Sequence, residues 1–217
     1  MAIRVLRAVA CGVLALAALL PGGGVVDAQD KGAPRRIVAL GDSLTAGFGL
    51  SGADAFPAVL QRELRAAGRN VEVVNFGISG DTTAGGVARV GAAIAARPSG
   101  VILELGANDA LRGLDPALAE ANLDNVITQL KRENIPVLLT GMRALTGMGR
   151  RYGEEFAAIY PRLAQKHGLM LYPFFLEGVA GDPALNLADG LHPNPQGVRE
   201  LVRRILPTVE RFLDSLP

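Results

Sequence analysis

A serine and a histidine at opposite ends of the chain could form a hydrolytic centre. Ser43 lies in the segment GDSLTAG, directly after a short apolar run, and His192 lies in DGLHP near the C-terminal end. A serine hydroxyl becomes a nucleophile when an imidazole accepts its proton, and the imidazole needs a carboxylate to fix its tautomer. Asp189 precedes His192 by three residues, so within a turn it can reach the same ring. These residue types predict acyl transfer through a serine nucleophile.

Each of these residues also has a purely structural interpretation. A serine at the start of a helix, such as Ser43, is typical of an N-cap. The other histidine, His167, precedes Gly168 in a segment typical of a helix end, where an imidazole usually satisfies the end carbonyls. We therefore expect no catalytic role for His167. Ser43 and the loop of His192 favour catalysis because they occur together.

Two further loops supply hydrogen-bond donors that an oxyanion would need. In GISGDTT, Gly80 would present a backbone N–H with no side chain in the way. In GAND, Asn108 would present a neutral side-chain amide. As structural alternatives, Gly80 is typical of a turn with positive φ, Asp81 of a helix N-cap, and the Asn108–Asp109 pair of a turn. We expect Asp42 to orient its loop, with Asp81 and Asp109 likewise structural.

Five short apolar runs rich in β-branched residues must position these loops. Between the runs, apolar residues recur at helical spacing. Five strands buried on both faces, alternating with helices, predict a three-layer α/β/α domain with a parallel sheet. Its site would lie at the carboxyl ends of the strands. Pro161 and Pro207 fall inside two predicted helices, which we expect to kink or restart there. The predicted strands span residues 36–40, 71–76, 101–105, 136–140 and 169–172.

The N-terminus predicts an export signal. Arg4 and Arg7 precede an apolar run over residues 8–20, and a Pro-Gly-Gly-Gly stretch ends it. The run is too short to span a bilayer comfortably, so we expect cleavage after Ala28, export to the periplasm or the medium, and no stable membrane insertion. An uncleaved anchor is the alternative. The predicted organisation is a signal peptide at 1–28, a flexible tail at 29–35 and one domain at 36–217.

Composition argues against several other classes of protein. The 22 Lys and Arg residues balance 21 Asp and Glu residues, and no basic stripe is present, so nucleic acid is not an expected partner. Two histidines and one cysteine cannot build a zinc site of the usual kind. No glycine-rich nucleotide loop follows a predicted strand. We expect a monomer that acts on a small-molecule ester or thioester without metal or cofactor.

Taken in order, the four blocks resemble those of the SGNH hydrolases, also called the GDSL esterases and lipases. The resemblance extends from residue 36 to the C-terminus and rests on GDSL, ISGD, GAND and DGLH. It implies a flavodoxin-like strand order and a triad of Ser43, His192 and Asp189. It also implies an oxyanion hole formed by the N–H groups of Ser43 and Gly80 and the side chain of Asn108.

Further stretches are similar to a bacterial periplasmic branch of this family. That branch implies acyl thioesters, aryl or short-to-medium-chain esters and lysophospholipids as substrates. It also implies that residues 110–114 close over an acyl chain. Ala107 and Ala110 stand where we expect glycine, which predicts a stiffer loop. The stretches are LELG at 103–106, ALRG at 110–113, AIYPRL at 158–163 and YPFF at 172–175.

We expect three residues to contact the acyl group, namely Leu111, Met142 and Leu145. The stretch 142–148 would form an apolar wall, although methionines in such a loop are equally typical of simple packing. Two other functions stay open. The same machinery could remove O-acetyl groups from carbohydrates, but few aromatic residues and no Trp weigh against a sugar-stacking site. A non-catalytic acyl-chain binder is the second alternative.

Overall fold

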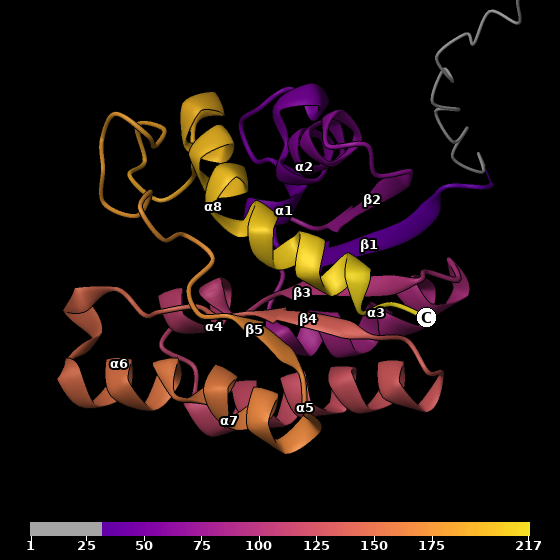
Figure 1. Ribbon diagram of the computed structural model, residues 1–217. Helices are drawn as coiled ribbons and strands as arrows, with labels where there is room; N and C mark the ends of the chain where they lie inside the picture. The colour runs from indigo at the N-terminus through magenta and orange to yellow at the C-terminus, as the bar shows by residue number, and fades with distance from the viewer. Residues whose placement is uncertain (1–31) are drawn as a thin grey trace, which may run out of the picture. The chain divides into compact units, whose positions relative to one another are not determined.

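The computed structural model describes residues 32–217, apart from the side chain of Thr146. The predicted signal peptide lies outside the described residues. Five parallel strands form one sheet in the order β2-β1-β3-β4-β5 (Figure 1). Each predicted strand is confirmed to within one residue, and so is the flavodoxin-like order. The strands are β1 (Arg35–Gly41), β2 (Val71–Gly77), β3 (Gly100–Glu104), β4 (Val137–Thr140) and β5 (Met170–Tyr172).

The prediction that all five strands are buried on both faces is wrong at the edges of the sheet. Every residue of β3 and β4 is buried. In β2 only Val71 and Val73 are buried, and in β5 only Tyr172. These two strands each have a single neighbour, so the layers that cover the middle of the sheet cover them only in part.

Helices cover both faces of this sheet. Figure 1 shows α2 and α8 together on one face and α3, α5 and α7 on the other, and the tertiary contacts agree. This confirms the three-layer architecture. The helices are α1 (Ser43–Ala46), α2 (Phe56–Ala66), α3 (Thr83–Ala95), α4 (Ala107–Leu111), α5 (Pro116–Arg132), α6 (Arg150–Ala157), α7 (Ile159–His167) and α8 (Pro195–Asp214), with short 3₁₀ turns η1 (Gly52–Asp54) and η2 (Thr146–Met148).

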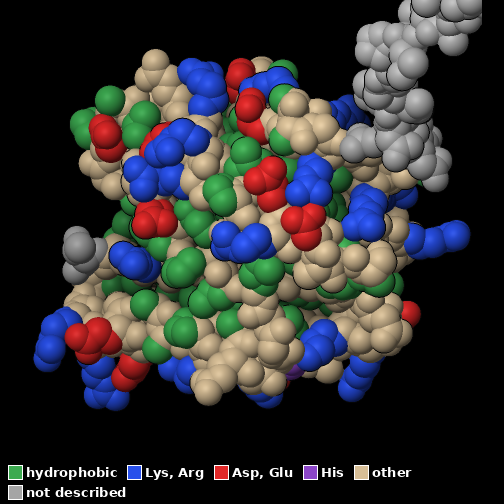
Figure 2. Space-filling view, viewed as in Figure 1, with side chains coloured by type: hydrophobic (Ala, Val, Ile, Leu, Met, Phe, Trp, Pro, Cys, Tyr) green, Lys and Arg blue, Asp and Glu red, His purple; other side chains and the backbone are tan. Residues whose placement is uncertain are grey.

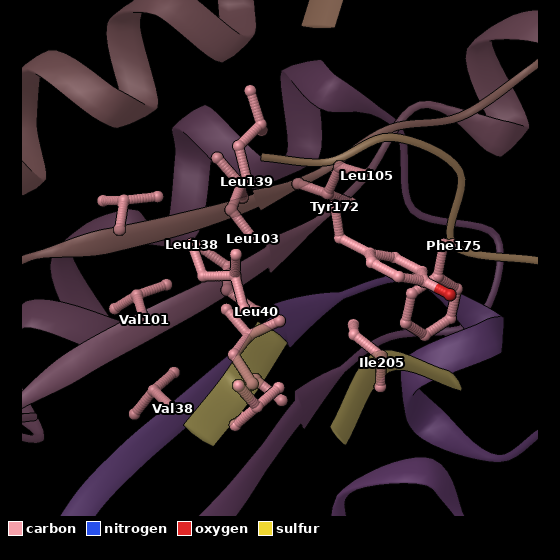
Figure 3. Packing of buried hydrophobic residues seen from close by; sticks show 14 of the residues in the cluster. Val38, Leu40, Val101, Leu103, Leu105, Leu138, Leu139, Tyr172, Phe175 and Ile205 are labelled. Carbon is pink, nitrogen blue, oxygen red and sulfur yellow. The ribbon is translucent and has the colours of Figure 1, made fainter. Parts of the chain in front are cut away.

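The core lies between the sheet and its helices. Figure 3 shows aliphatic side chains of the three central strands, among them Leu40, Leu103 and Leu139, packed side by side, with Ile205 of α8 nearby. All four are fully buried. Because a buried aliphatic side chain contributes about 1.5–3 kcal/mol, this layer gives the loops at the strand ends a rigid base.

The two prolines behave differently. A new helix, α7, begins at Ile159, and Pro161 falls in its first turn, where the missing N–H breaks no helical hydrogen bond. The predicted restart is confirmed there. At Pro207, α8 continues without a restart, and Ile205 and Val209 on either side are fully buried. Within residues 32–217, no helix has both the length and the apolar character that crossing a bilayer requires.

Candidate active site

A pocket of about 350 Å³ opens at the carboxyl ends of the strands. Its walls come from the segments that follow all five strands. Four of the residues predicted from the sequence line it together: Ser43, Gly80, Asn108 and His192. Asp189 lies behind the histidine ring. The sheet thus brings residues from both ends of the chain to one point.

The serine, the histidine and the aspartate form a continuous hydrogen-bonded line. His192 Nε2 lies 2.9 Å from Ser43 Oγ, and His192 Nδ1 lies 2.7 Å from Asp189 Oδ2. An ionised carboxylate only accepts hydrogen bonds, so Nδ1 donates to Asp189 and Nε2 is left to accept the serine proton. The backbone N–H groups of His192 and Leu191 both donate to Asp189 Oδ1. These bonds, together with the bond from the His192 ring, lower the pKa of Asp189 to about 2.

Local structure fixes the loop that carries Asp189 and His192. An isolated β-bridge joins Asn186 to Pro193 across the loop, and Gly190 adopts the positive φ that its turn requires. The buried side chain of Asn186 donates to the carbonyls of Val179 and Asp182. This loop is therefore held at its base.

Ser43 begins helix α1, but it is not the N-cap. Asp42 takes that place and accepts a hydrogen bond from the N–H of Leu44. The structural alternative for Ser43 is wrong, because its hydroxyl faces His192 instead. A Cβ at Gly41 would overlap the side chains of Thr45 and Glu104, so only glycine fits before Asp42.

Three residues that line the pocket, Ser43, Gly80 and Asn108, carry N–H hydrogens that no group of the described residues accepts. Within residues 32–217, the N–H groups of Ser43 and Gly80 donate to no protein acceptor. Gly80 has a φ of +82°, and Asp81 N–H donates to the Ile78 carbonyl, so Gly80 also meets the expectation of a turn glycine. Asn108 Nδ2 donates one hydrogen to Asp42 Oδ2 over 3.3 Å, and its second hydrogen stays available.

Asp81 and Asp109 make structural contacts, as expected. Asp109 accepts hydrogen bonds from the N–H and the hydroxyl of Thr83, at 2.8 and 2.6 Å. It lies in helix α4, so the structural alternative of a turn at Asn108–Asp109 is wrong. Asp81 accepts a hydrogen bond from Arg89, and the N-cap of α3 is Thr82, so the N-cap alternative for Asp81 is also wrong.

A pair of buried acids lies beneath the serine. Asp42 and Glu104 are both almost completely buried. Burial raises the pKa of Asp42 to about 6. Burial, and next the charge of Asp42, raises the pKa of Glu104 well above its usual value. Glu104 Oε2 accepts a hydrogen bond from Thr45, and Oε1 has no partner within the described residues. Sequence reasoning missed Glu104 as a buried acid next to Asp42. Its only signal in the sequence is a charged residue inside an apolar strand.

The predicted acyl-contact residues all line the pocket. Met142 is buried in its wall, and Leu111 and Leu145 lie exposed at its mouth. Sequence reasoning missed Phe48, whose ring centroid lies 4.5 Å from that of His192.

The second histidine, His167, lies away from the pocket. Its ring bonds to Asp124 over 2.6 Å, so the expectation that the ring satisfies helix-end carbonyls is wrong. Within residues 32–217, no group of three or more His, Cys, Asp and Glu side chains could hold a metal ion.

Comparison with known proteins identifies the family. Residues 39–200 match the model of the GDSL-like lipase/acylhydrolase family. The chain belongs to this family. It is 39% identical to esterase TesA of Pseudomonas aeruginosa, over 84% of this chain and 92% of the relative. It is 42% identical to thioesterase 1/protease 1/lysophospholipase L1 of Escherichia coli strain K12, over 73% and 75%.

Among solved structures, that of AlinE4, an SGNH-hydrolase family esterase, superposes with a TM-score of 0.71 at 46% identity. The match covers 84% of this chain and 98% of that one. The family membership makes this GDSL-type protein a hydrolase, and its fold is the SGNH hydrolase fold.

Proposed function

We propose that this GDSL-type hydrolase cleaves acyl thioesters, aryl and short-to-medium-chain carboxylic esters, and lysophospholipids through an acyl-enzyme intermediate. The observation that carries the proposal is the hydrogen-bonded line from Asp189 through His192 to Ser43 at the floor of the pocket. The same constellation performs acyl transfer on unrelated folds, so its geometry rather than its position in the chain supports the role.

In the first step, His192 Nε2 takes the hydroxyl proton as Ser43 Oγ attacks the carbonyl carbon. The N–H groups of Ser43 and Gly80 and the amide of Asn108 bind the oxyanion. His192 then gives its proton to the leaving group, and the acyl group stays on Ser43. A water molecule, deprotonated by His192, attacks the acyl-enzyme; the bond between the acyl carbon and Ser43 Oγ breaks, His192 returns the proton to Ser43 Oγ, and the acid is released. The ionised Asp189 stabilises the imidazolium in both halves.

The walls of the pocket favour acyl substrates. Leu111, Met142, Leu145 and Leu176 line it, which suits an alkyl chain. The names of the relatives include esterase, thioesterase and lysophospholipase. A carbohydrate O-acetylesterase is less favoured, because the whole sequence has no Trp on which a sugar could stack.

The test is the hydrolysis of p-nitrophenyl esters of increasing acyl length and of a palmitoyl thioester. We expect Ser43→Ala to lose turnover by about 10⁴-fold or more while it stays folded. Ser79→Ala is a matched control, since Ser79 lines the same pocket but lies outside the hydrogen-bonded line. Turnover retained by Ser43→Ala would refute the nucleophile. Turnover by neither protein would favour the deacetylase or the acyl-chain binder, which sugar acetates and a fluorescent fatty acid would separate.

We also propose that the enzyme is exported and acts as a monomer on small-molecule substrates. The basic and apolar pattern of residues 1–28 supports export. N-terminal sequencing of the exported protein tests it, and an intact residue 1 would contradict cleavage.

A further inference from the structure

The large hydrophobic side chains that stay exposed gather at one edge of the molecule. Within residues 32–217 there are seven, and every one lies on a segment that leaves the carboxyl end of a strand. All five strands are followed by at least one, and four of the seven line the pocket. We call this set the apolar rim. It consists of Phe48 after β1, Ile78 after β2, Leu111, Leu114 and Leu118 after β3, Leu145 after β4 and Leu191 after β5.

Substrate binding in the pocket accounts for only part of the apolar rim. Ile78, Leu114 and Leu118 do not line the pocket. Leu118 is nevertheless 63% exposed and Ile78 52% exposed. A group of exposed apolar side chains on the loops at one edge of a sheet is typical of an interaction surface, because isolated exposed apolar residues are usually scattered. The rim therefore extends beyond what the acyl chain itself would cover.

Two arginines lie among the rim residues without an acidic partner in the described part of the chain. Arg112 donates to the Gly80 carbonyl over 2.9 Å, and the Arg143 guanidinium lies 4.6 Å from the centre of the Phe174 ring. Arg150 and Arg151, by contrast, each pair with a glutamate one turn further along α6. Beside these contacts, each guanidinium keeps N–H groups that can donate to a phosphate.

Charge alone does not distinguish this edge. Figure 2 shows basic and acidic side chains interspersed over the face in view. Asp115, beside Leu114, turns its carboxylate to the N–H of Ala117 at the start of α5. The distinguishing feature is apolar side chains together with unpaired arginines, which suits the boundary between lipid headgroups and acyl chains.

We propose that the apolar rim docks reversibly on the surface of a phospholipid bilayer, with the pocket mouth facing the lipid. The apolar side chains enter the headgroup layer, and Arg112 and Arg143 contact lipid phosphates. An acyl chain then enters the pocket without crossing water. The advantage for catalysis rests on the proposed function, but docking itself needs no turnover. Such peripheral binding differs from stable insertion of a membrane span.

Vesicle binding tests the docking step by itself. The protein carries Ser43→Ala, so no lipid is consumed, and its partitioning onto vesicles of phosphatidylcholine and phosphatidylglycerol is measured by flotation. We expect Ile78→Gln with Leu118→Gln to weaken partitioning by about tenfold, because two half-exposed aliphatic side chains no longer enter the lipid. The matched control, Ile78→Val with Leu118→Met, keeps the surface apolar and should bind as before. All variants share one N-terminus, so a difference in binding cannot come from that segment. Binding by the Gln variant equal to that of the natural chain would overturn the proposal.

Kinetics of the active enzyme separate docking from the proposed function. We expect the Gln variant to hydrolyse soluble p-nitrophenyl butyrate as the natural chain does. Its hydrolysis of lysophosphatidylcholine held in the same vesicles should fall with its partitioning. An equal loss on both substrates would place the effect in the pocket and contradict docking.

The remaining outcomes also separate the two proposals. If no ester is hydrolysed but the vesicle-binding difference persists, docking stands and the proposed function fails. If sizing without lipid shows a dimer that the Gln variant dissociates, and the natural chain does not bind vesicles, the rim is a self-association surface and docking is wrong.

Discussion

Asp42 and Asp189 belong to the same site, one next to Ser43 in the chain and one hydrogen-bonded to His192, and their surroundings shift their pKa values in opposite directions. Asp42 is fully buried, and burial raises its pKa to about 6. Asp189 is more exposed and accepts hydrogen bonds from two backbone N–H groups, and these bonds lower its pKa to about 2. Two aspartates near one nucleophile thus have different protonation behaviour because of backbone geometry and burial rather than residue type.

Because of this difference in pKa, the two aspartates have different roles. Asp189 stays ionised at neutral pH and can stabilise an imidazolium, which the proposed mechanism needs. Asp42 holds structure: its Oδ1 caps α1 and its Oδ2 holds the amide of Asn108. The loop after β1 therefore builds the floor of the site, and the loop before α8 supplies the charge.

Asp189→Asn should give the largest effect. The new side chain can still accept from the backbone with its oxygen, but it presents an NH₂ group to His192 Nδ1 and so favours the wrong tautomer. We expect kcat to fall by about 10⁴-fold with little change in thermal stability. Steady-state kinetics on p-nitrophenyl butyrate and a melting curve measure both. A loss below tenfold would remove Asp189 from the proposed triad.

Asp42→Asn should give a smaller loss of activity. Its Oδ1 can still cap α1, but its amide would face the amide of Asn108, donor against donor. Because one oxyanion donor is then misplaced, we expect kcat to fall by about tenfold to a hundredfold, with KM nearly unchanged. Unaltered kcat would show that Asn108 needs no support from Asp42.

The pH dependence of the free energy of unfolding tests the raised pKa of Asp42. Its pKa is higher in the folded chain than the usual 3.8, so its protonated form favours folding. That contribution is complete below pH 3.8 and is lost as the pH rises through about 6. The natural chain should therefore lose on the order of 2 kcal/mol relative to Asp42→Asn between pH 4 and 7. Urea unfolding across this range measures it, and parallel curves for the two proteins would contradict the raised pKa.

The sequence predicted the parts of this comparison that depend on local pattern. Apolar runs and helical spacing predicted the strands, and the placement of Ser43 and His192 after strands and before helices predicted that they meet. It could not predict the state of Asp42 and Glu104, because burial of a carboxyl depends on which helices cover it. The contact between Phe48 and His192 was missed for the same reason, since their loops meet only in the folded chain.

The smallest expected effect concerns α4, which carries the Asn108 that Asp42 holds. Ala107 and Ala110 lie in this short helix, and Ala110 is buried. Glycine at both positions should loosen α4, because each replacement costs a helix about 1 kcal/mol. We expect Ala107→Gly with Ala110→Gly to shift the preference among p-nitrophenyl esters toward longer acyl chains by about fivefold or less. Ala121→Gly in α5 controls for a helix weakened away from the pocket. A chain-length profile identical to that of the natural protein would show that α4 does not limit access of the acyl chain, and would leave Asp42 as the main constraint on Asn108.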